Sequence, residues 1–334
     1  MSSIFSLGEA SVFREKFFDL VETAQQVVIT SHFSPDDDSI GSVLLMRALL
    51  VAKYPEKNIR IIYTGSSVDR YRIFSGFENI EWVSDITEKL EGSELLITLD
   101  GSNWRRFSKK PEVLADLSIR IGIDHHVSEP DDYTLLLKDE SSRSNTELMY
   151  QIFLKDKAYD KTVAEYIFLG LVGDTGGFAY ISAESSGTFL LIKELIEKVG
   201  VSMDTFRSRY MGIPLRIIPL LQELVKNTNY KTITSWPPFQ YTFVSDTGSY
   251  SDEDMSAASH IYMGQYLPRV EGYAWGFVLT PRKDGTHRMS SRSLSGSVDV
   301  NDFHARLGIG GGHIRASGGA LSETTVESCL EKVF

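Results

Sequence analysis

The sequence predicts an α/β protein: a largely parallel sheet with helices on both faces, followed by a smaller C-terminal α/β domain. In the first half of the chain, short runs rich in β-branched residues alternate with stretches whose apolar residues recur at helical spacing. This alternation is typical of parallel sheets that are covered by crossover helices. From residue 239 onward the pattern changes to strands joined by a tight turn, then a helix and a glycine-rich segment.

The length of 334 residues favours two domains. We predict a first domain at residues 1–195, a connector at residues 196–238 and a second domain at residues 239–334. The connector is polar and interrupted by prolines, with one amphipathic helix at residues 215–226.

In the first domain, four apolar runs are expected to form buried strands, with helices between and after them. The helix that begins near Ser144 has an S-x-x-E capping motif completed by Glu147. Phe13, Phe17 and Phe18 have helical spacing and are expected to be buried. The expected strands are residues 27–30, 59–63, 95–99 and 119–123, and the expected helices are residues 40–52, 144–154, 162–172 and 186–199.

The second domain has fewer clear elements. A hairpin turn is expected at residues 283–285, and a glycine-rich loop closes the domain at residues 308–319. The expected strands are residues 241–245, 273–280 and 286–292, and the expected helix is residues 300–307.

The composition excludes several classes of protein. The formal net charge of -11 argues against a grip on long nucleic acid, which usually needs a basic groove. Small anionic substrates stay open, because metal ions can supply positive charge locally. The single cysteine, Cys329, excludes an intramolecular disulfide and fits a reducing compartment. The sequence has no signal-peptide pattern and no apolar run of about 18 residues, so we expect a cytoplasmic protein without a membrane span.

The segment at residues 32–42, HFSPDDDSIGS, contains the strongest chemical signal. One histidine, His32, and three carboxylates, Asp36, Asp37 and Asp38, follow an expected strand and precede an expected helix. Carboxylates this close repel one another unless cations hold them, so a hard divalent ion is the natural partner. An acidic N-terminal helix cap is the structural alternative, and it would by itself account for Asp37 and Ser39.

Three further polar groups follow expected elements. Asp124, His125 and His126 come at the end of one strand, Asp100 ends another, and Asp174 lies in a GDTGG segment after a helix. Taken one at a time, they have ordinary explanations as loop histidines, a turn-forming aspartate and a helix terminator.

Taken together, these groups predict a two-metal site. Histidine nitrogens combined with carboxylate oxygens suit manganese, with magnesium or cobalt as alternatives. The set is large enough for two ions about 3.5–4 Å apart that share one carboxylate, an arrangement that activates a bridging water. The predicted metal ligands are His32, Asp36, Asp38, Asp100, His125 and Asp174.

The glycine-rich segment near the C-terminus has two interpretations. Its glycines would let backbone N–H groups approach an anion, with His313 as an added donor, or they would form a tight turn before a strand. Arg292 is either a phosphate partner or a solvated strand residue. Arg143 and Asn145 lie at an expected helix start, where they would touch phosphate or, in the case of Asn145, cap the helix.

These motifs resemble those of the DHH phosphoesterase superfamily. Residues 32–42 match its first motif, H-x-x-P-D-x-D-[AS]-x-G-S, and residues 124–126 are the Asp-His-His motif that names it. Asp100 and Asp174 fall in the expected order. Residues 310–318, GGGHIRASG, resemble the G-G-G-H-x-x-A-[AS]-G loop of the DHH-associated domain. The resemblance spans about residues 26–180 and continues at the C-terminus. The sequence departs from the pattern at Asp37, where many relatives have glycine, and at Ser39, which replaces alanine; Asp37 would alter metal preference or point outward.

The resemblance implies roles for individual residues. His32 and Asp36 would hold one metal, Asp38, His125 and Asp174 the other, and Asp100 would bridge them. Asp124 would orient a neighbouring histidine, and His126 would lie near the scissile phosphate, so the implied catalytic residues are Asp100, Asp124 and His126. The substrate would lie in a cleft between the two domains. The implied substrate contacts are Arg143, Arg292, Gly311, Gly312 and His313.

Among members of this superfamily, the chain looks most like the oligoribonucleases that cleave very short RNA and also dephosphorylate 3′-phosphoadenosine 5′-phosphate. The implied reaction is two-metal hydrolysis by a hydroxide that bridges the ions. A soluble phosphodiesterase acting on cyclic or linear diadenylate is the main alternative. An exopolyphosphatase and a catalytically silent nucleotide-binding module are weaker ones, the latter because all six ligand positions are filled. The expected partners are short oligoribonucleotides or nucleotides, with neither long nucleic acid nor membrane, and a homodimer is one option for assembly.

Overall fold

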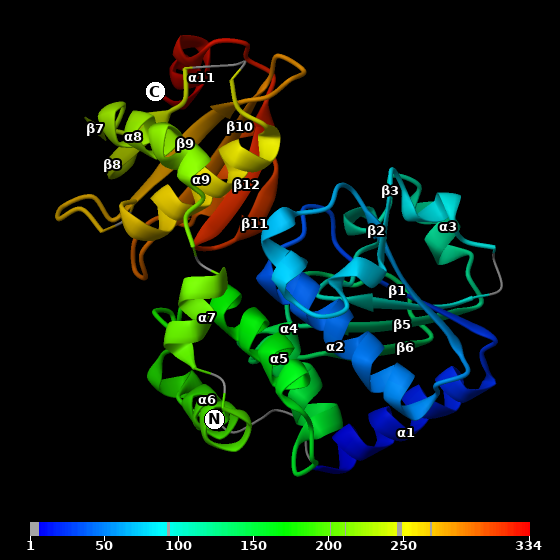
Figure 1. The fold of residues 1–334 in the computed structure, drawn as a ribbon. Helices are drawn as coiled ribbons and strands as arrows, with labels where there is room; N and C mark the ends of the chain where they lie inside the picture. The colour runs from blue at the N-terminus through cyan, green and yellow to red at the C-terminus, as the bar shows by residue number, and fades with distance from the viewer. Residues whose placement is uncertain (1–6, 92–93, 201, 211, 246–248, 268) are drawn as a thin grey trace. The chain divides into compact units, whose positions relative to one another are not determined.

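The computed structural model describes residues 7–91, 94–200, 202–210, 212–245, 249–267 and 269–334. The chain divides into two compact units, Met1–Gly212 and Ile213–Phe334, and each unit is built around its own six-stranded sheet (Figure 1). The α/β fold class is therefore confirmed. The domain boundaries stay a prediction, because the expected connector at residues 196–238 contributes helices to both units and a strand to the second sheet.

The sheet of the first unit is entirely parallel. Its strand order is β3-β2-β1-β4-β5-β6, so the chain runs outward from β1 in one direction and then returns to the other side of β1 with β4. In such sheets, ligands bind beyond the carboxyl ends of the strands where the order reverses. The strands are β1 (Gln26–Ser31), β2 (Asn58–Thr64), β3 (Ile80–Val83), β4 (Leu95–Leu99), β5 (Ile119–Asp124) and β6 (Leu135–Lys138).

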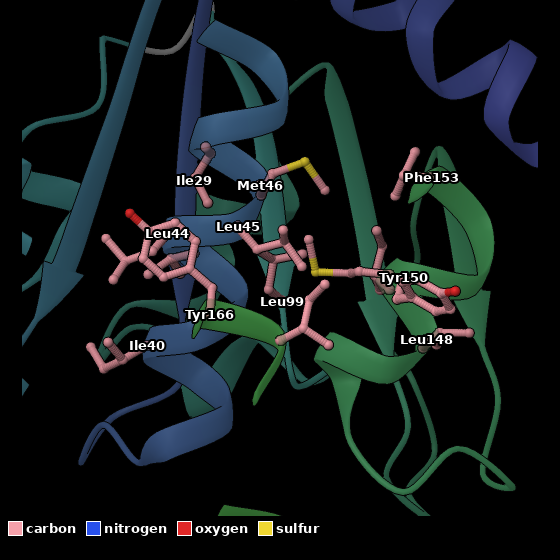
Figure 2. Close-up of a cluster of buried hydrophobic side chains, with 14 of the residues drawn as sticks. Ile29, Ile40, Leu44, Leu45, Met46, Leu99, Leu148, Tyr150, Phe153 and Tyr166 are labelled. Atoms are coloured by element: carbon pink, nitrogen blue, oxygen red, sulfur yellow. The ribbon is translucent and has the colours of Figure 1, made fainter. Parts of the chain in front are cut away.

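Two hydrophobic clusters cover the two faces of this sheet. Val27 and Ile29 of β1 belong to the larger cluster, which Figure 2 shows between α2, β4 and α4, whereas Val28 belongs to a smaller one with Trp104 and Leu114. Strand side chains alternate between faces, so this division follows from the strand geometry. The larger cluster takes in α1 (Leu7–Thr23), α2 (Asp37–Lys53), α4 (Asn145–Met149) with its π-helical continuation η5 (Tyr150–Leu154), α5 (Lys161–Asp174), α6 (Thr188–Val199) and α7 (Met203–Tyr210); the smaller one takes in α3 (Pro111–Ala115) and η4 (Trp104–Arg106).

Glycines let α2 and α5 approach closely. A Cβ atom at Gly41 would lie 2.7 Å from the carbonyl oxygen of Tyr166, and one at Gly173 would lie 2.4 Å from the Cβ of Asp37. Real Cβ atoms essentially never come that close to another heavy atom. The absence of side chains at these positions therefore brings the N-terminal end of α2 against the C-terminal half of α5.

The second unit has a mixed sheet of order β11-β12-β10-β9-β8-β7, in which only the pairing of β8 with β9 is parallel. The segment expected as a loop at residues 308–319 is instead mostly two paired strands, because its small residues fit an edge hairpin. The strands are β7 (Asn229–Ile233), β8 (Trp236–Phe243), β9 (Trp275–Pro281), β10 (His287–Ser293), β11 (Gly311–His313) and β12 (Ala316–Leu321); the helices are α8 (Ile218–Lys226), α9 (Asp252–Gln265), α10 (Val300–Leu307) and α11 (Val326–Val333).

In the part of the chain that the structure describes, every helix is too short or too polar to cross a membrane.

Candidate metal centre

The polar residues singled out in the first unit lie where three neighbouring strands end. His32 follows β1, Asp100 follows β4, and His125 follows β5. These strands are adjacent in the sheet, and the order reverses between β1 and β4. The parallel sheet therefore brings together residues that are far apart in the sequence.

His32, Asp36 and Asp100 form the first group of donor atoms. The Nε2 atom of His32 lies 3.4 Å from Oδ2 of Asp36 and 3.2 Å from Oδ2 of Asp100. The other ring nitrogen, Nδ1, lies 2.8 Å from the carbonyl oxygen of Phe33. A carbonyl can only accept, so Nδ1 carries a proton, and Nε2, on the side of the carboxylates, is the ring nitrogen that would bind a metal ion.

Asp36 serves two purposes through its two oxygens. Its Oδ1 atom accepts a hydrogen bond of 2.9 Å from the amide of Ser39, and the hydroxyl of Ser39 accepts from the amide of Asp36 at 2.8 Å. This reciprocal pair is a capping box at the start of α2. Because Oδ2 faces His32, the capping interpretation and the metal-ligand interpretation of Asp36 are compatible.

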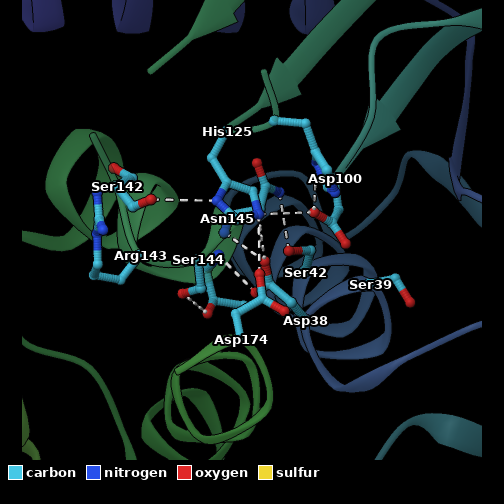
Figure 3. A network of polar contacts seen from close by, with 12 residues as sticks. Asp38, Ser39, Ser42, Asp100, His125, Ser142, Arg143, Ser144, Asn145 and Asp174 are labelled. Atoms are coloured by element: carbon cyan, nitrogen blue, oxygen red, sulfur yellow. Dashed lines mark hydrogen bonds and ion pairs between the residues drawn. The ribbon is translucent and has the colours of Figure 1, made fainter. Parts of the chain in front are cut away.

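Asp38, Asp100, His125 and Asp174 form the second group (Figure 3). The Nε2 atom of His125 lies 3.6 Å from Asp38, 3.3 Å from Asp100 and 3.0 Å from Asp174, measured to one carboxylate oxygen of each. Its Nδ1 atom lies 3.2 Å from the carbonyl oxygen of Ser142, which leaves Nε2 as the free donor.

Asp100 belongs to both groups, one oxygen to each. Its backbone has a φ of 58°, in the left-handed region that aspartate and asparagine tolerate better than most residues. Its amide donates to the carbonyl of Ile123 at 3.0 Å, which fixes the turn after β4. Within the described residues, Oδ1 of Asp100 and Nε2 of His125 are buried and face each other at 3.3 Å, but neither makes a well-aligned hydrogen bond, as expected for atoms that bind an ion.

Electrostatics of the site also favours bound cations. Burial lowers the pKa of His32, but the charges of Asp36 and Asp100 outweigh burial and raise that pKa to about 10. Burial, together with the charges of Asp100 and Asp174, raises the pKa of Asp38 well above its usual range. Burial likewise raises the pKa of Asp174 to about 6, although a neighbouring imidazole opposes the shift. The negative charge of the buried carboxylates therefore exceeds the positive charge that nearby side chains provide. Bound divalent ions would neutralise this excess negative charge.

Asp124 holds His126. The Oδ1 atom of Asp124 lies 2.9 Å from Nδ1 of His126 and accepts from the His126 amide at 3.0 Å, while Oδ2 accepts from the hydroxyl of Ser102 at 2.6 Å. Both oxygens of Asp124 are thus engaged within the protein, which suits the predicted orienting role. Nδ1 of His126 also lies 3.5 Å from Oδ1 of Asp100, so His126 lies beside the shared carboxylate.

The start of α4 holds Asp38, a feature that the sequence analysis missed. The amide of Thr146 donates to Oδ1 of Asp38 at 3.0 Å, and the amide of Asn145 donates to Oδ2. A Cβ atom at Gly170 would lie 2.1 Å from Oδ1 of Asp38, so only glycine leaves room for the carboxylate there. The capping motif at Ser144 marked this helix start, but no local pattern connects it with Asp38.

Asp37, whose role the sequence left open, lies outside the donor groups. Its Oδ1 atom accepts hydrogen bonds from Nη2 of Arg70 at 2.7 Å and from the hydroxyl of Tyr71 at 2.8 Å. The carboxylate is therefore neutralised by Arg70 instead of adding charge to the two donor groups.

The predicted substrate contacts are divided between the two units, with Arg143 in the first and the others in the second. The guanidinium of Arg143 donates to the carbonyl of Ser141, and Nη1 of Arg292 donates to the carbonyl of Ser291. The Gly312 amide donates to Oδ1 of Asn301 at 2.9 Å, so this amide is engaged within the second unit. Gly311 lies on β11 opposite Gly318. The His313 side chain lies outside the described part of the structure.

Comparison with known proteins agrees with these motifs. Residues 26–171 match the model of the DHH family, N-terminal domain. The chain is 28% identical to the bifunctional oligoribonuclease and PAP phosphatase NrnA of Bacillus subtilis over 300 residues, 88% of this chain and 89% of the relative. It is 23% identical to the probable bifunctional oligoribonuclease and PAP phosphatase NrnA of Streptococcus mutans over 309 residues, 89% of this chain and 90% of the relative.

Two further matches are to proteins that are described by other names. The cyclic-di-AMP phosphodiesterase PdeA of Listeria monocytogenes is 23% identical over 346 residues, which cover 97% of this chain but 49% of the relative. The crystal structure of an exopolyphosphatase-related protein from Bacteroides fragilis superimposes with a TM-score of 0.81 at 23% identity, covering 99% of this chain and 96% of that one. At this identity the structural match supports the fold.

Proposed function

We propose that this chain, which belongs to the DHH phosphoesterase superfamily and is a phosphoester hydrolase, acts on very short oligoribonucleotides and on 3′-phosphoadenosine 5′-phosphate. The main support is that the candidate donor groups in the described part of the chain all share Asp100: the two described above, and a third with His125 and His126 that overlaps the second. Two groups joined by one carboxylate match the requirement of two-metal phosphoester hydrolysis. The substrate range is supported by the two relatives named as oligoribonuclease and PAP phosphatase, each matched over most of its length.

In this proposal each donor group holds one divalent ion. His32 and Asp36 bind the first ion, and Asp38, His125 and Asp174 bind the second. When bound, such a pair lowers the pKa of a water held between the ions and neutralises charge on the phosphate. Manganese is the proposed metal, because it accepts imidazole nitrogens as ligands more readily than magnesium does. Cobalt is an alternative.

The remaining polar residues position the reacting groups. Asp124 holds Nδ1 of His126, so that the imidazole presents its other nitrogen with a fixed orientation, suited to contact the phosphate or to transfer a proton at the leaving oxygen. Arg143, Arg292, Gly311, Gly312 and His313 are proposed to contact substrate. Gly312 also lets β11 pair with β12, because a Cβ atom there would lie 2.5 Å from the carbonyl oxygen of Ala316.

A preference for short substrates follows from charge. The net charge of -11 adds a general repulsion that grows with the length of a polyanion. A second candidate function, hydrolysis of cyclic or linear diadenylate, is favoured by the match to PdeA, which spans 97% of this chain.

A substrate panel with the purified full chain tests these proposals. The protein is stripped with a chelator and supplied with manganese, magnesium or cobalt. It is then offered diadenylate, cyclic diadenylate, a longer RNA of about 24 nucleotides, 3′-phosphoadenosine 5′-phosphate, pyrophosphate and polyphosphate. We expect turnover only with metal, and higher kcat/KM for two- to five-nucleotide RNAs than for the long one.

Other outcomes have defined meanings. Turnover by the stripped protein would rule out the two-metal mechanism. Equal or faster cleavage of the long RNA would rule out the short-substrate preference. Activity confined to cyclic diadenylate or to polyphosphate would replace the proposed function by the corresponding alternative, and binding without turnover of any substrate would indicate a silent binding module.

A further inference from the structure

The turn η4 (Trp104–Arg106) lies directly against the metal centre. It follows Asp100 by a few residues, and the carbonyl oxygen of its last residue, Arg106, accepts a hydrogen bond of 2.7 Å from the amide of Phe33. Phe33 is the residue after His32. The backbone of Arg106 is therefore tied to the end of β1, where the first donor group lies.

Buried aromatic residues hold this turn rigidly. Trp104 and Phe107 are buried in the smaller core cluster, and the ring of Trp104 lies 4.2 Å from that of Tyr133. Oδ1 of Asn103 accepts a hydrogen bond of 3.1 Å from the amide of Arg105 and so caps the turn. With both flanking aromatics anchored, Arg105 is exposed, whereas Arg106 is half-buried.

The guanidinium of Arg106 is directed toward the loop that carries Asp100. A Cβ atom at Gly101 would lie 3.6 Å from Nη1 of Arg106. The charge is also close enough to His32 to lower the pKa of that imidazole. Other arginines of the first unit pair with carboxylates, such as Arg60 with Glu81 and Arg70 with Asp37.

Arg106 differs from these arginines. Within the residues that the structure describes, its guanidinium has no hydrogen bond or ion pair with the protein, although it lies against Gly101 and close to His32. A half-buried guanidinium without an ion-pair partner does not stabilise the fold through an ion pair. It is instead suited to bind an anion that comes from outside the protein.

A charge argument indicates which anion. The four carboxylates of the two donor groups would balance the charge of two divalent ions, so the negative charge of the substrate phosphate would still lack a matching positive charge. Negative charge increases on the phosphate oxygens in the transition state of hydrolysis, and a guanidinium placed beforehand stabilises it without reorganisation. Arg106 is a half-buried guanidinium beside Gly101, the residue that follows the shared Asp100, and it meets this need.

We propose that Arg106 is a catalytic residue that binds a non-bridging oxygen of the phosphate that is cleaved. The proposal deepens the proposed function and rests on it for the reaction, but the phosphate contact can be measured without turnover. The same contact serves every phosphoester substrate, because it involves only the group that reacts.

The test compares Arg106→Gln with Arg105→Gln, a neighbouring exposed arginine on the same turn, and with Arg106→Lys. Removal of one preorganised donor to a developing charge typically costs about a hundredfold or more in kcat. We expect Arg106→Gln to lose on the order of a hundredfold in kcat on diadenylate and, equally, on bis-p-nitrophenyl phosphate. Arg106→Lys should recover part of the loss, because it keeps the charge without the paired donors. Arg105→Gln should match the wild type.

A binding measurement does not depend on turnover. Titration calorimetry with adenosine 5′-monophosphate on the manganese-loaded proteins should show about ten- to hundredfold weaker binding by Arg106→Gln, with unchanged metal content and melting temperature. Equal affinity of Arg106→Gln and wild type, or a loss confined to diadenylate, would overturn the proposal. So would a failure of wild type to bind the monophosphate. If the wild type cleaves bis-p-nitrophenyl phosphate but no nucleotide, the proposed substrate range is wrong. The titration with the monophosphate still tests the role of Arg106 in that case.

Discussion

The two units use their sheets differently to place functional residues. In the first unit, a parallel sheet collects loop residues from widely separated parts of the sequence at the carboxyl ends of its strands. In the second unit, a mostly antiparallel sheet places the candidate residues in register: Arg292 of β10 pairs with Ala316 of β12, which pairs with His313 of β11.

The two units also differ in the interactions that hold their candidate functional residues in place. The donor side chains of the first unit are held by side-chain and amide hydrogen bonds, such as those from Thr146 to Asp38 and from Ser39 to Asp36. The second unit positions its glycine-rich hairpin mainly by backbone pairing, with side-chain contacts such as that of Asn301 with the Gly312 amide. We therefore expect changes in the first unit to affect chemistry on every substrate, and changes in the second unit to affect the capture of nucleotides.

The largest effect is expected for Asp100→Asn. Asparagine tolerates the left-handed backbone of this position, so the variant should fold, but it loses the charge that both donor groups share. We predict a loss of activity on the order of a thousandfold or more on all esters, together with fewer bound manganese ions by elemental analysis. The exposed Asp116→Asn is the control. Full metal content with full activity in Asp100→Asn would exclude the shared-ligand role.

His313→Ala tests the other side of the comparison. A lost hydrogen bond to a charged phosphate costs about 1.5–3 kcal/mol, or roughly ten- to a hundredfold in kcat/KM. We expect that loss on diadenylate, no loss of manganese, and little change on bis-p-nitrophenyl phosphate. His260→Ala, on the exposed side of α9, is the control. If metal is lost, or if both substrates are affected equally, the division between chemistry and capture is wrong.

Gly170→Ala and Gly264→Ala compare helix glycines of the two units. The added methyl group at Gly170 would meet Oδ1 of Asp38 at 2.1 Å, whereas nothing lies within 4 Å of a Cβ atom at Gly264. We predict that Gly170→Ala lowers the free energy of unfolding by about 1–3 kcal/mol and weakens manganese binding, because Asp38 must move. Gly264→Ala should leave stability unchanged or raise it by up to about 1 kcal/mol. Denaturant unfolding measures the stability of each variant, and metal titration measures its affinity for manganese. If the two substitutions have equal effects, the argument from close packing at Gly170 is wrong.

A further effect, which needs no substitution, is expected in the pH dependence of the chelated protein. The pKa of His32 is about 10 in the folded state against 6.5 for the ordinary imidazole, and that of His125 is raised as well. Between these values the folded state binds more protons than the unfolded state, so stability is full below about pH 6.5 and falls as pH rises toward 10. The melting temperature of the stripped protein should therefore decline by several degrees across this window, and manganese should remove the decline by replacing the protons. A decline that persists unchanged in His32→Gln would show that other groups cause it.

Much of the fold and of the candidate site could be predicted from the sequence, for physical reasons. Apolar runs with the period of a strand predicted the central strands of the first sheet. Apolar residues at helical spacing predicted the main helices that pack on it. Short edge strands such as β3 and β6, and α9 in the second unit, escaped prediction because their local patterns are weak and their stability comes from tertiary neighbours. The edge hairpin of β11 and β12 was taken for a loop because glycine propensity alone does not reveal pairing with a distant strand.

The sequence by itself determined the donor chemistry: which histidines and carboxylates are available, and that His32, Asp100 and His125 follow strands whose ends meet at one edge of a parallel sheet. Only the tertiary structure decided which oxygen of Asp36 caps a helix and which faces His32, and that Asp37 pairs with Arg70. Only tertiary structure, too, placed Gly170 against Asp38 and Arg106 beside Gly101. The reason is physical: residue type sets what an atom can bind, but packing between segments distant in sequence sets which partner it meets.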